Sequence, residues 1–149
     1  MKKIINVNNT SETTDIALLV ARVGIAALML THGIPKLMML LSGAPIQFPG
    51  MLGMSPELTL GLAIFAEVFC SLAILTGFAT RLATVPLIST MLVAVLLVHS
   101  ADPFTVKESG LTYLVGYTML LFAGSGKYSI DYLLSREQRA TPALVLIDK

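Results

Sequence analysis

Charged residues and cysteines are scarce in this chain, and each scarcity excludes a class of function. Only 13% of the 149 residues are charged, about half the fraction found in a typical soluble domain. The net charge of +1 provides no basic field for nucleic acid, and no stripe of lysine and arginine is interleaved with aromatic residues. The single cysteine, Cys70, excludes an intramolecular disulfide, an internal dithiol exchange and a multi-cysteine zinc site.

Apolar residues are abundant instead. Hydrophobic residues make up 55% of the chain, and the mean hydropathy is +0.81. Four apolar segments, at about 16–42, 57–79, 82–100 and 110–126, come near the ~20 residues that a helix needs to cross a bilayer. The sequence therefore predicts one all-α domain, an integral membrane four-helix bundle with the lipid bilayer as its surroundings.

The segments outside these helices divide the chain. A polar arm (1–15) precedes the predicted domain (16–131), and because the arm turns polar directly after its lysines we expect no signal-peptide cleavage. The connection 43–56 holds three prolines and three glycines, so it lies at the membrane surface or folds back over the bundle. The connection 77–81 is short enough for a tight turn between antiparallel helices. In the tail (132–149), the part from Ser135 onward is expected to be a loose extension.

The distribution of lysine and arginine predicts the orientation. The N-terminal arm, Arg81 and the C-terminal region carry most of them on one side, and only Lys36 and Lys107 lie toward the other. By the positive-inside rule both termini are then cytoplasmic, which agrees with four spans. We therefore expect a multi-pass protein of the bacterial cytoplasmic (inner) membrane.

Glu67 lies near the middle of an apolar stretch, where an ionisable side chain normally faces a partner, a cavity or a substrate. On the first helix Arg22, Met29 and Lys36 repeat every seven residues, and His32 lies four before Lys36, so they form one polar stripe. Snorkelling to the lipid headgroups is an alternative explanation for Arg22 and for Lys36. His32 lies deeper, and it either pairs within the bundle or binds a ligand.

Depth along the helices brings several of these groups to one layer. His32 and Glu67 come out near mid-depth, with Lys36 about one turn away. We predict a ligand-binding or proton-relay layer, and the alternative is a salt-bridge network that only fixes helix register. The candidates for the layer are His32, Lys36, Glu67, His99 and Glu108. Arg22, Arg81 and Asp131 are interpreted as structural polar residues.

Two further interpretations concern metals and glycines. His32 and His99 have no third ligand at a diagnostic spacing, so no metal site is expected. Gly24, Gly33, Gly61 and Gly77 are interpreted as points of close helix contact.

Several short motifs resemble the DoxX family of small four-span membrane proteins over about residues 16–134. They are Arg22 and His32-Gly33-x-x-Lys36-Leu37 in the first helix, Glu67 in the second, and Gly77-x-x-Thr80-Arg81-x-Ala83 after it. His99 closes the third helix, and Gly124-Ser125-Gly126-Lys127-Tyr128-Ser129-Ile130-Asp131 is similar to the family's Gly-x-Gly-x-x-Ser-x-Asp ending.

The resemblance implies a membrane subunit of a redox system, because the family takes its name from a subunit of a thiosulfate:quinone oxidoreductase. It implies a quinone-like ligand near His32, Glu67 and His99, since histidine and glutamate can supply the protons that a quinone takes up. No haem, iron–sulfur or flavin ligand set is present, so no covalently bound cofactor is expected and electrons would come from a redox partner protein. The alternatives are a non-enzymatic membrane scaffold that binds partners and a proton-coupled carrier, which as four spans would need to form a homo-oligomer.

Overall fold

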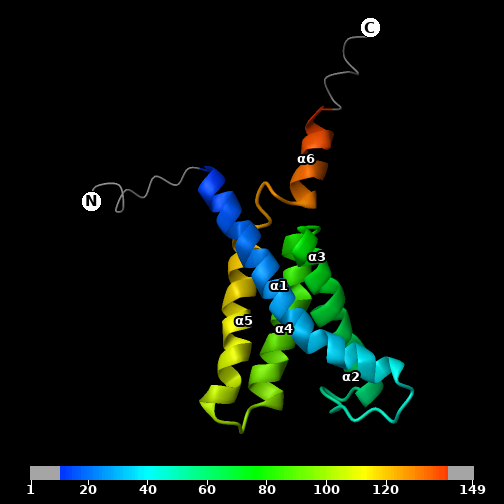
Figure 1. The fold of residues 1–149 in the computed structure, drawn as a ribbon. Helices are drawn as coiled ribbons and strands as arrows, with labels where there is room; N and C mark the ends of the chain where they lie inside the picture. The colour runs from blue at the N-terminus through cyan, green and yellow to red at the C-terminus, as the bar shows by residue number, and fades with distance from the viewer. Residues whose placement is uncertain (1–10, 141–149) are drawn as a thin grey trace.

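In the computed structural model, residues 11–140 are described, and every regular element among them is helical (Figure 1). The all-α prediction is therefore confirmed for this part of the chain. Residues 1–10 and 141–149, which carry part of the charge used to predict the orientation, lie outside it. The elements are α1 (Ser11–Leu41), α2 (Pro56–Ile64), η1 (Phe65–Cys70), α3 (Ser71–Thr76), α4 (Thr80–Val93), η2 (Ala94–Val98), α5 (Phe104–Ala123) and α6 (Ile130–Ala140).

Two of the long helices contain a π-helical segment. The elements α2, η1 and α3 follow one another without a break, as do α4 and η2. Among the described residues, three helices are long and apolar enough to cross a membrane: Glu12–Leu41, Pro56–Thr76 and Thr80–Val98. The fourth long helix, α5, is not among them, because Lys107 and Glu108 near its start shorten its apolar part. The chain is a membrane protein with several apolar helices, and three of the four predicted spans meet this criterion.

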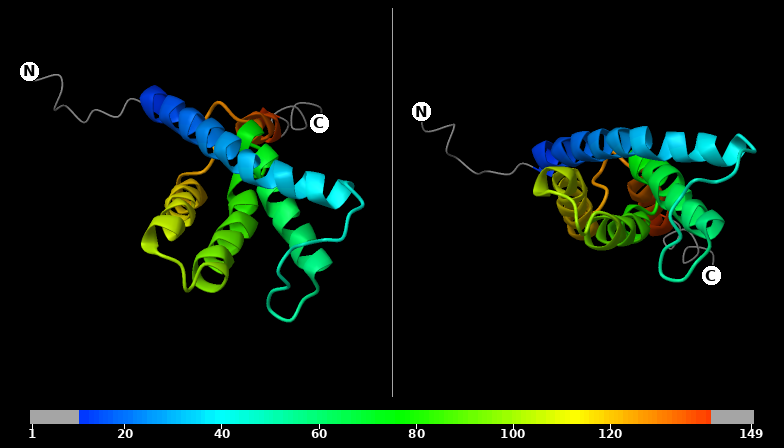
Figure 2. Two further views of the ribbon diagram at one scale, coloured as in Figure 1. Left: turned by 60° about the horizontal axis from the view of Figure 1, so that its bottom comes forward. Right: turned by 90° about the horizontal axis from the view of Figure 1, so that it is seen from below.

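The helices form a curved row with α1 laid across it. Seen from below, α5, α4 and the α2–α3 helix stand side by side, and α1 covers one side of the row (Figure 2). The start of α1, the α3–α4 turn and α6 lie at one end of the molecule (Figure 1). The α1–α2 loop and the η2–α5 connection lie at the other end.

The core follows from residues spaced four apart on the facing sides of these helices. Cys70 and Ile74 on one helix pack against a row on α4, and Tyr117 from α5 completes the cluster. That row consists of Ala83, Leu87 and Met91. Large apolar side chains such as Val20, Leu82 and Phe122 are exposed on the outside, as expected for a surface that faces lipid.

The observed helix bounds differ from the predicted ones by more than three residues at the start of the first helix, at the start of the fourth helix and in the tail. The fourth helix begins at Phe104 instead of residue 110, because Pro103 adopts extended backbone geometry and starts the helix there. It ends before Gly124, whose φ of 81° a helix cannot continue. The expectation of a loose extension from Ser135 is wrong for Ser135–140, which belong to α6. Residues 11–15, assigned to the polar arm, are also helical.

The predicted tight turn at 77–81 is confirmed. Gly77 caps α3 in the left-handed conformation with a φ of 71°, and α4 begins at Thr80. A Cβ atom at Gly77 would overlap the Arg22 guanidinium, so this glycine serves a close contact as predicted. Gly24 and Gly61 have nothing within 4 Å of where a Cβ would be, so the same interpretation is wrong for them.

Candidate functional site

Glu67 lies in the π-helical segment η1 and is almost fully buried. Single π-helical turns within α-helices occur frequently at functional sites. The helix α1 comes very close to η1 at Gly33, where a Cβ atom would lie 2.8 Å from Cγ2 of Val68 and 3.0 Å from Cβ of Glu67. Any other residue at position 33 would therefore push the two helices apart. Lys36 follows Gly33 by one helical turn and so reaches the carboxylate of Glu67.

Lys36 and Glu67 form an ion pair between Nζ and Oε1. The Glu67 side chain is 3% exposed, whereas that of Lys36 is 27% exposed. The second carboxylate oxygen, Oε2 of Glu67, is buried and has no hydrogen-bond partner among the described residues. The Lys36 ammonium also lies 5.9 Å from the centre of the Phe48 ring. Lys36 is thus held by a partner inside the bundle, and this ion pair explains its position without snorkelling.

His32 contacts aromatic rings instead of a charged group. Its ring meets Tyr113 edge-on, with the ring centres 5.7 Å apart, and Tyr113 stacks on Tyr117 at 6.1 Å. Within residues 11–140, neither ring nitrogen of His32 takes part in a hydrogen bond or ion pair. Both nitrogens are therefore able to bind a ligand. Sequence reasoning missed Tyr113, and the available signal was a pair of tyrosines four residues apart in an apolar helix.

These groups surround a small cavity, the polar cavity, of about 240 Å³. It lies between α1, η1, η2 and the first turns of α5, so four long helices contribute to its wall. The titratable side chains that line it are His32, Lys36, Glu67, His99, Lys107 and Tyr113.

A second and larger cavity, the apolar groove, adjoins the same ion pair. It measures about 590 Å³ and is lined mainly by apolar side chains of the 48–54 loop, the α2–η1 helix and α4–η2. Lys36, Glu67 and His99 line both cavities. The loop between the first two helices therefore folds back over the bundle, as one of the two sequence alternatives stated.

The structure places His99 at the rim and Glu108 outside. Nδ1 of His99 lies 2.7 Å from Oδ2 of Asp102, and both side chains are partly exposed. Glu108 lines a different, open groove between α1 and α5, so the prediction that it joins the layer is wrong. The neighbouring Lys107 faces the polar cavity instead, since successive residues on a helix point about 100° apart.

The three residues interpreted as structural have partners at the opposite end of the bundle. Arg22 is fully buried and donates from Nη1 to the Ile74 carbonyl at 3.2 Å and from Nη2 to that of Tyr128, so the snorkelling explanation is wrong for it too. Asp131 accepts hydrogen bonds from the backbone N–H groups of Ala79 at 2.7 Å and Thr80 at 3.0 Å. Nη2 of Arg81 donates to the Phe122 carbonyl at 3.2 Å. Asp131 thereby attaches the start of α6 to the α3–α4 turn, Arg81 links the start of α4 to the end of α5, and Arg22 links α1 to α3 and to the segment after α5.

Comparison with known proteins gives one match. The sequence profile of the DoxX family matches residues 17–100, which is more than half of the 149-residue chain. Comparison with curated proteins and with solved structures gives no match. The matched span contains His32, Lys36, Glu67 and His99, whereas Tyr113 and the segment after α5 lie beyond it. In the described part of the chain no three His, Cys, Asp or Glu side chains gather as a metal-binding group.

Proposed function

The chain belongs to the DoxX family of membrane proteins, and from that premise we propose that it is a membrane subunit of a redox system that binds a quinone-like lipid at the Lys36–Glu67 pair. The observation that carries the proposal is that a polar cavity and an apolar groove meet at one buried ion pair. A prenylated quinone combines a polar ring with an apolar tail, so its two parts match the two cavities.

The sizes and linings of the two cavities support placing the ring in the polar cavity and the tail in the apolar groove. The apolar groove, at about 590 Å³, falls within the ~300–1,000 Å³ typical of small-ligand sites. Its apolar walls suit an isoprenoid tail, because they offer van der Waals contacts and few polar groups that the tail would leave without a partner. The polar cavity of about 240 Å³ has room for a ring and holds donors to its oxygens in Lys36 and Lys107.

The side chains around the polar cavity also suit proton transfer. A quinone supplies a two-electron acceptor that takes up two protons on reduction. His32 has two ring nitrogens without hydrogen bonds within the described residues, and Glu67 has a buried oxygen without a partner. These are groups that can hold a proton within reach of a bound ring. Electrons would come from a redox partner protein, and the site of action would be the bacterial cytoplasmic membrane with both termini inside.

One observation favours a second candidate, a non-enzymatic membrane scaffold. Lys36 and Glu67 pair with each other, and such a pair fixes the register of α1 against η1 without any ligand. In that case the cavities would be filled by lipid of any kind, and the buried charges would serve only the fold.

Bound lipid separates the two candidates. The full-length protein is purified in mild detergent, its lipids are extracted, and quinone is quantified by mass spectrometry for the wild type, Glu67→Gln and a control, Glu57→Gln. Glu57 is exposed at the start of α2 and lines neither cavity. We expect quinone in the wild type and the control and its loss in Glu67→Gln. Equal quinone in all three proteins, or none in any of them, would overturn the proposal.

A further inference from the structure

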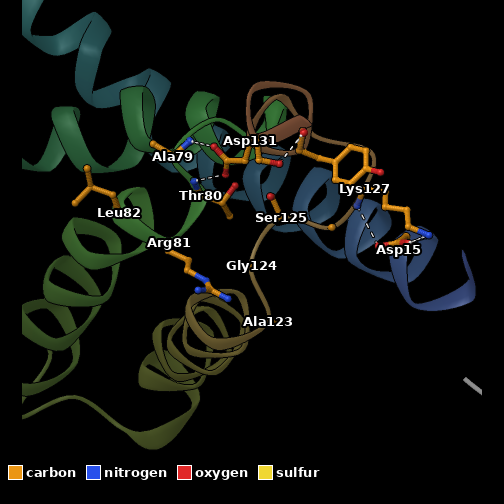
Figure 3. A pocket seen from close by; sticks show the side chains of 13 residues that line it. Asp15, Ala79, Thr80, Arg81, Leu82, Ala123, Gly124, Ser125, Lys127 and Asp131 are labelled. Atoms are coloured by element: carbon orange, nitrogen blue, oxygen red, sulfur yellow. Dashed lines mark hydrogen bonds and ion pairs between the residues drawn. The ribbon is translucent and has the colours of Figure 1, made fainter. Parts of the chain in front are cut away.

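A third cavity lies at the other end of the molecule, where the described chain begins and ends (Figure 3). This end cavity measures about 790 Å³ and opens between the first turns of α1, the start of α4, the segment after α5 and the start of α6. Its polar side chains include Asp15, Thr80, Arg81, Ser125, Lys127 and Asp131. None of them lines the cavities at the Lys36–Glu67 pair.

The charges in the end cavity leave one cation without a carboxylate. Both oxygens of Asp131 accept backbone hydrogen bonds from the α3–α4 turn. Asp15 accepts from the backbone N–H of Lys127 at 3.0 Å and pairs with its Nζ at 3.3 Å. Arg81 donates from Nη2 to a carbonyl oxygen, and no ion pair of Arg81 occurs within residues 12–136, whose side chains the structure describes. The guanidinium therefore offers a positive charge and further N–H donors to a ligand.

A buried hydroxyl independently points to a ligand at the same place. The Thr80 side chain is fully buried, and its Oγ1 has no hydrogen-bond partner among the described residues. Such a group costs free energy unless something pairs with it. Thr80 is the first residue of the 14-residue helix α4, and its backbone N–H already donates to Asp131, so its hydroxyl is the donor that remains for a ligand. In Figure 3 the Arg81 side chain lies below those of Thr80 and Ser125, and all three line the cavity.

The backbone at Gly124 leaves room for the Arg81 guanidinium. Gly124 has a φ of 81°, and a Cβ atom there would lie 3.3 Å from Nε of Arg81. The glycine thus leaves room for Arg81 along the segment 123–126. This segment differs from a nucleotide phosphate loop, which lies between a strand and a helix, because it follows the helix α5.

The depth of the cavity indicates which anions it meets. The apolar spans Pro56–Thr76 and Thr80–Val98 meet at the turn that forms its wall, and the span Glu12–Leu41 starts beside it. The ends of apolar spans lie at the level of the lipid headgroups. We propose that the end cavity binds a phosphate group, carried by a lipid headgroup or free in solution, through the guanidinium of Arg81 and the hydroxyls of Thr80 and Ser125.

Thermal unfolding of the purified, delipidated full-length chain tests this site with three probes. They are short-chain phosphatidylglycerol, the diacylglycerol with the same chains, and inorganic phosphate with chloride at equal ionic strength as its reference. Phosphatidylglycerol should raise Tm more than the diacylglycerol. A rise with inorganic phosphate above chloride would identify free phosphate as a sufficient ligand, whereas a rise with the lipid alone would identify a headgroup. No rise above the matched reference with either probe would overturn the proposal.

Variants assign the effect to the cavity. Arg81→Gln should raise the dissociation constant for the phosphate probe by about tenfold, the size expected for losing a charged hydrogen bond. The control Arg136→Gln lies on α6 outside the cavity and should bind as the wild type does. Thr80→Val keeps the side-chain shape, so its Tm without ligand should equal or exceed the wild-type value while its response to the probe falls. A response unchanged in both Arg81→Gln and Thr80→Val would contradict the site, and Thr80→Val alone decides if Arg81→Gln does not fold.

Discussion

Removing either member of the Lys36–Glu67 pair should destabilise the protein, but by unequal amounts. Lys36→Met leaves the Glu67 carboxylate, 3% exposed, buried without a counter-charge, which costs ~3–5 kcal/mol for a buried pair broken on one side. Glu67→Gln leaves Lys36, 27% exposed and beside Phe48, with a route to water and a neutral amide as acceptor. We expect that variant to lose ~1–3 kcal/mol, the cost of an imperfectly satisfied polar group.

The double variant measures the coupling between the two side chains. With Lys36→Met and Glu67→Gln combined, no buried charge remains, so the protein should be more stable than with Lys36→Met alone. The coupling energy between the two positions should fall within the ~0.5–3 kcal/mol seen for residues in direct contact.

Unfolding in detergent micelles by titration with dodecyl sulfate, followed by circular dichroism, measures these free energies. Lys107→Met is the matched control, because Lys107 lines the same polar cavity but donates to a carbonyl oxygen, that of Ser100, and pairs with no carboxylate among residues 11–140. It should lose under about 1 kcal/mol, as for one ordinary hydrogen bond. Lys36→Met should be the least stable of these three variants. If it is as stable as Glu67→Gln or Lys107→Met, then Glu67 does not depend on Lys36 as its counter-charge.

Three further outcomes follow from the opposite end of the bundle. Gly77→Ala forces a non-glycine residue into left-handed geometry, which costs ~1–2 kcal/mol, and adds overlap with the Arg22 guanidinium; the same titration should show a larger loss than that strain alone, and a neutral effect would contradict the close contact. Asp131→Ala removes two bonds to the start of α4 and should lower stability by the ~0.5–2 kcal/mol typical of a lost helix cap, whereas an unchanged midpoint would mean that this cap is dispensable. Single cysteines at Glu12 and Ser135, introduced in a chain without the native cysteine, should react with a membrane-impermeant thiol reagent in inside-out vesicles and not in intact cells. The reason is that the start of α1 and α6 lie at one end of the molecule (Figure 1). Labelling of the two positions from opposite sides of the membrane would contradict this arrangement.

The sequence predicted the apolar helices because hydropathy acts over long stretches, and it predicted a polar layer around Glu67 from depth along those helices. Runs of apolar residues determine which segments cross the bilayer, and depth along antiparallel helices placed His32 level with Glu67 and Lys36 about one turn away. The direct contact between Lys36 and Glu67 bridges that offset, because α1 approaches η1 closely at Gly33 and the lysine side chain is long.

Packing rotates and pairs side chains in ways that hydropathy does not record. The choice between Lys107 and Glu108 depends on the rotation of α5, which its contacts with α4 determine. Arg22 was open to a snorkelling explanation because its acceptor on Tyr128 lies over a hundred positions later in the sequence. The π-helical turn around Glu67 leaves no recognisable pattern of residues, and neither does the aromatic contact between His32 and Tyr113.

Photolabelling with an azido-substituted prenylated quinone shows directly whether a quinone binds at the Lys36–Glu67 pair. The full-length protein in lipid nanodiscs is irradiated with the analogue, with and without excess unlabelled quinone, and the labelled peptides are identified by mass spectrometry. We expect labelling that unlabelled quinone suppresses, in the peptides that hold His32–Lys36 and the η2 segment up to His99, and its loss in Glu67→Gln. Labelling that excess quinone does not suppress, or that falls only on the outward faces of the helices, would contradict a quinone site at the Lys36–Glu67 pair.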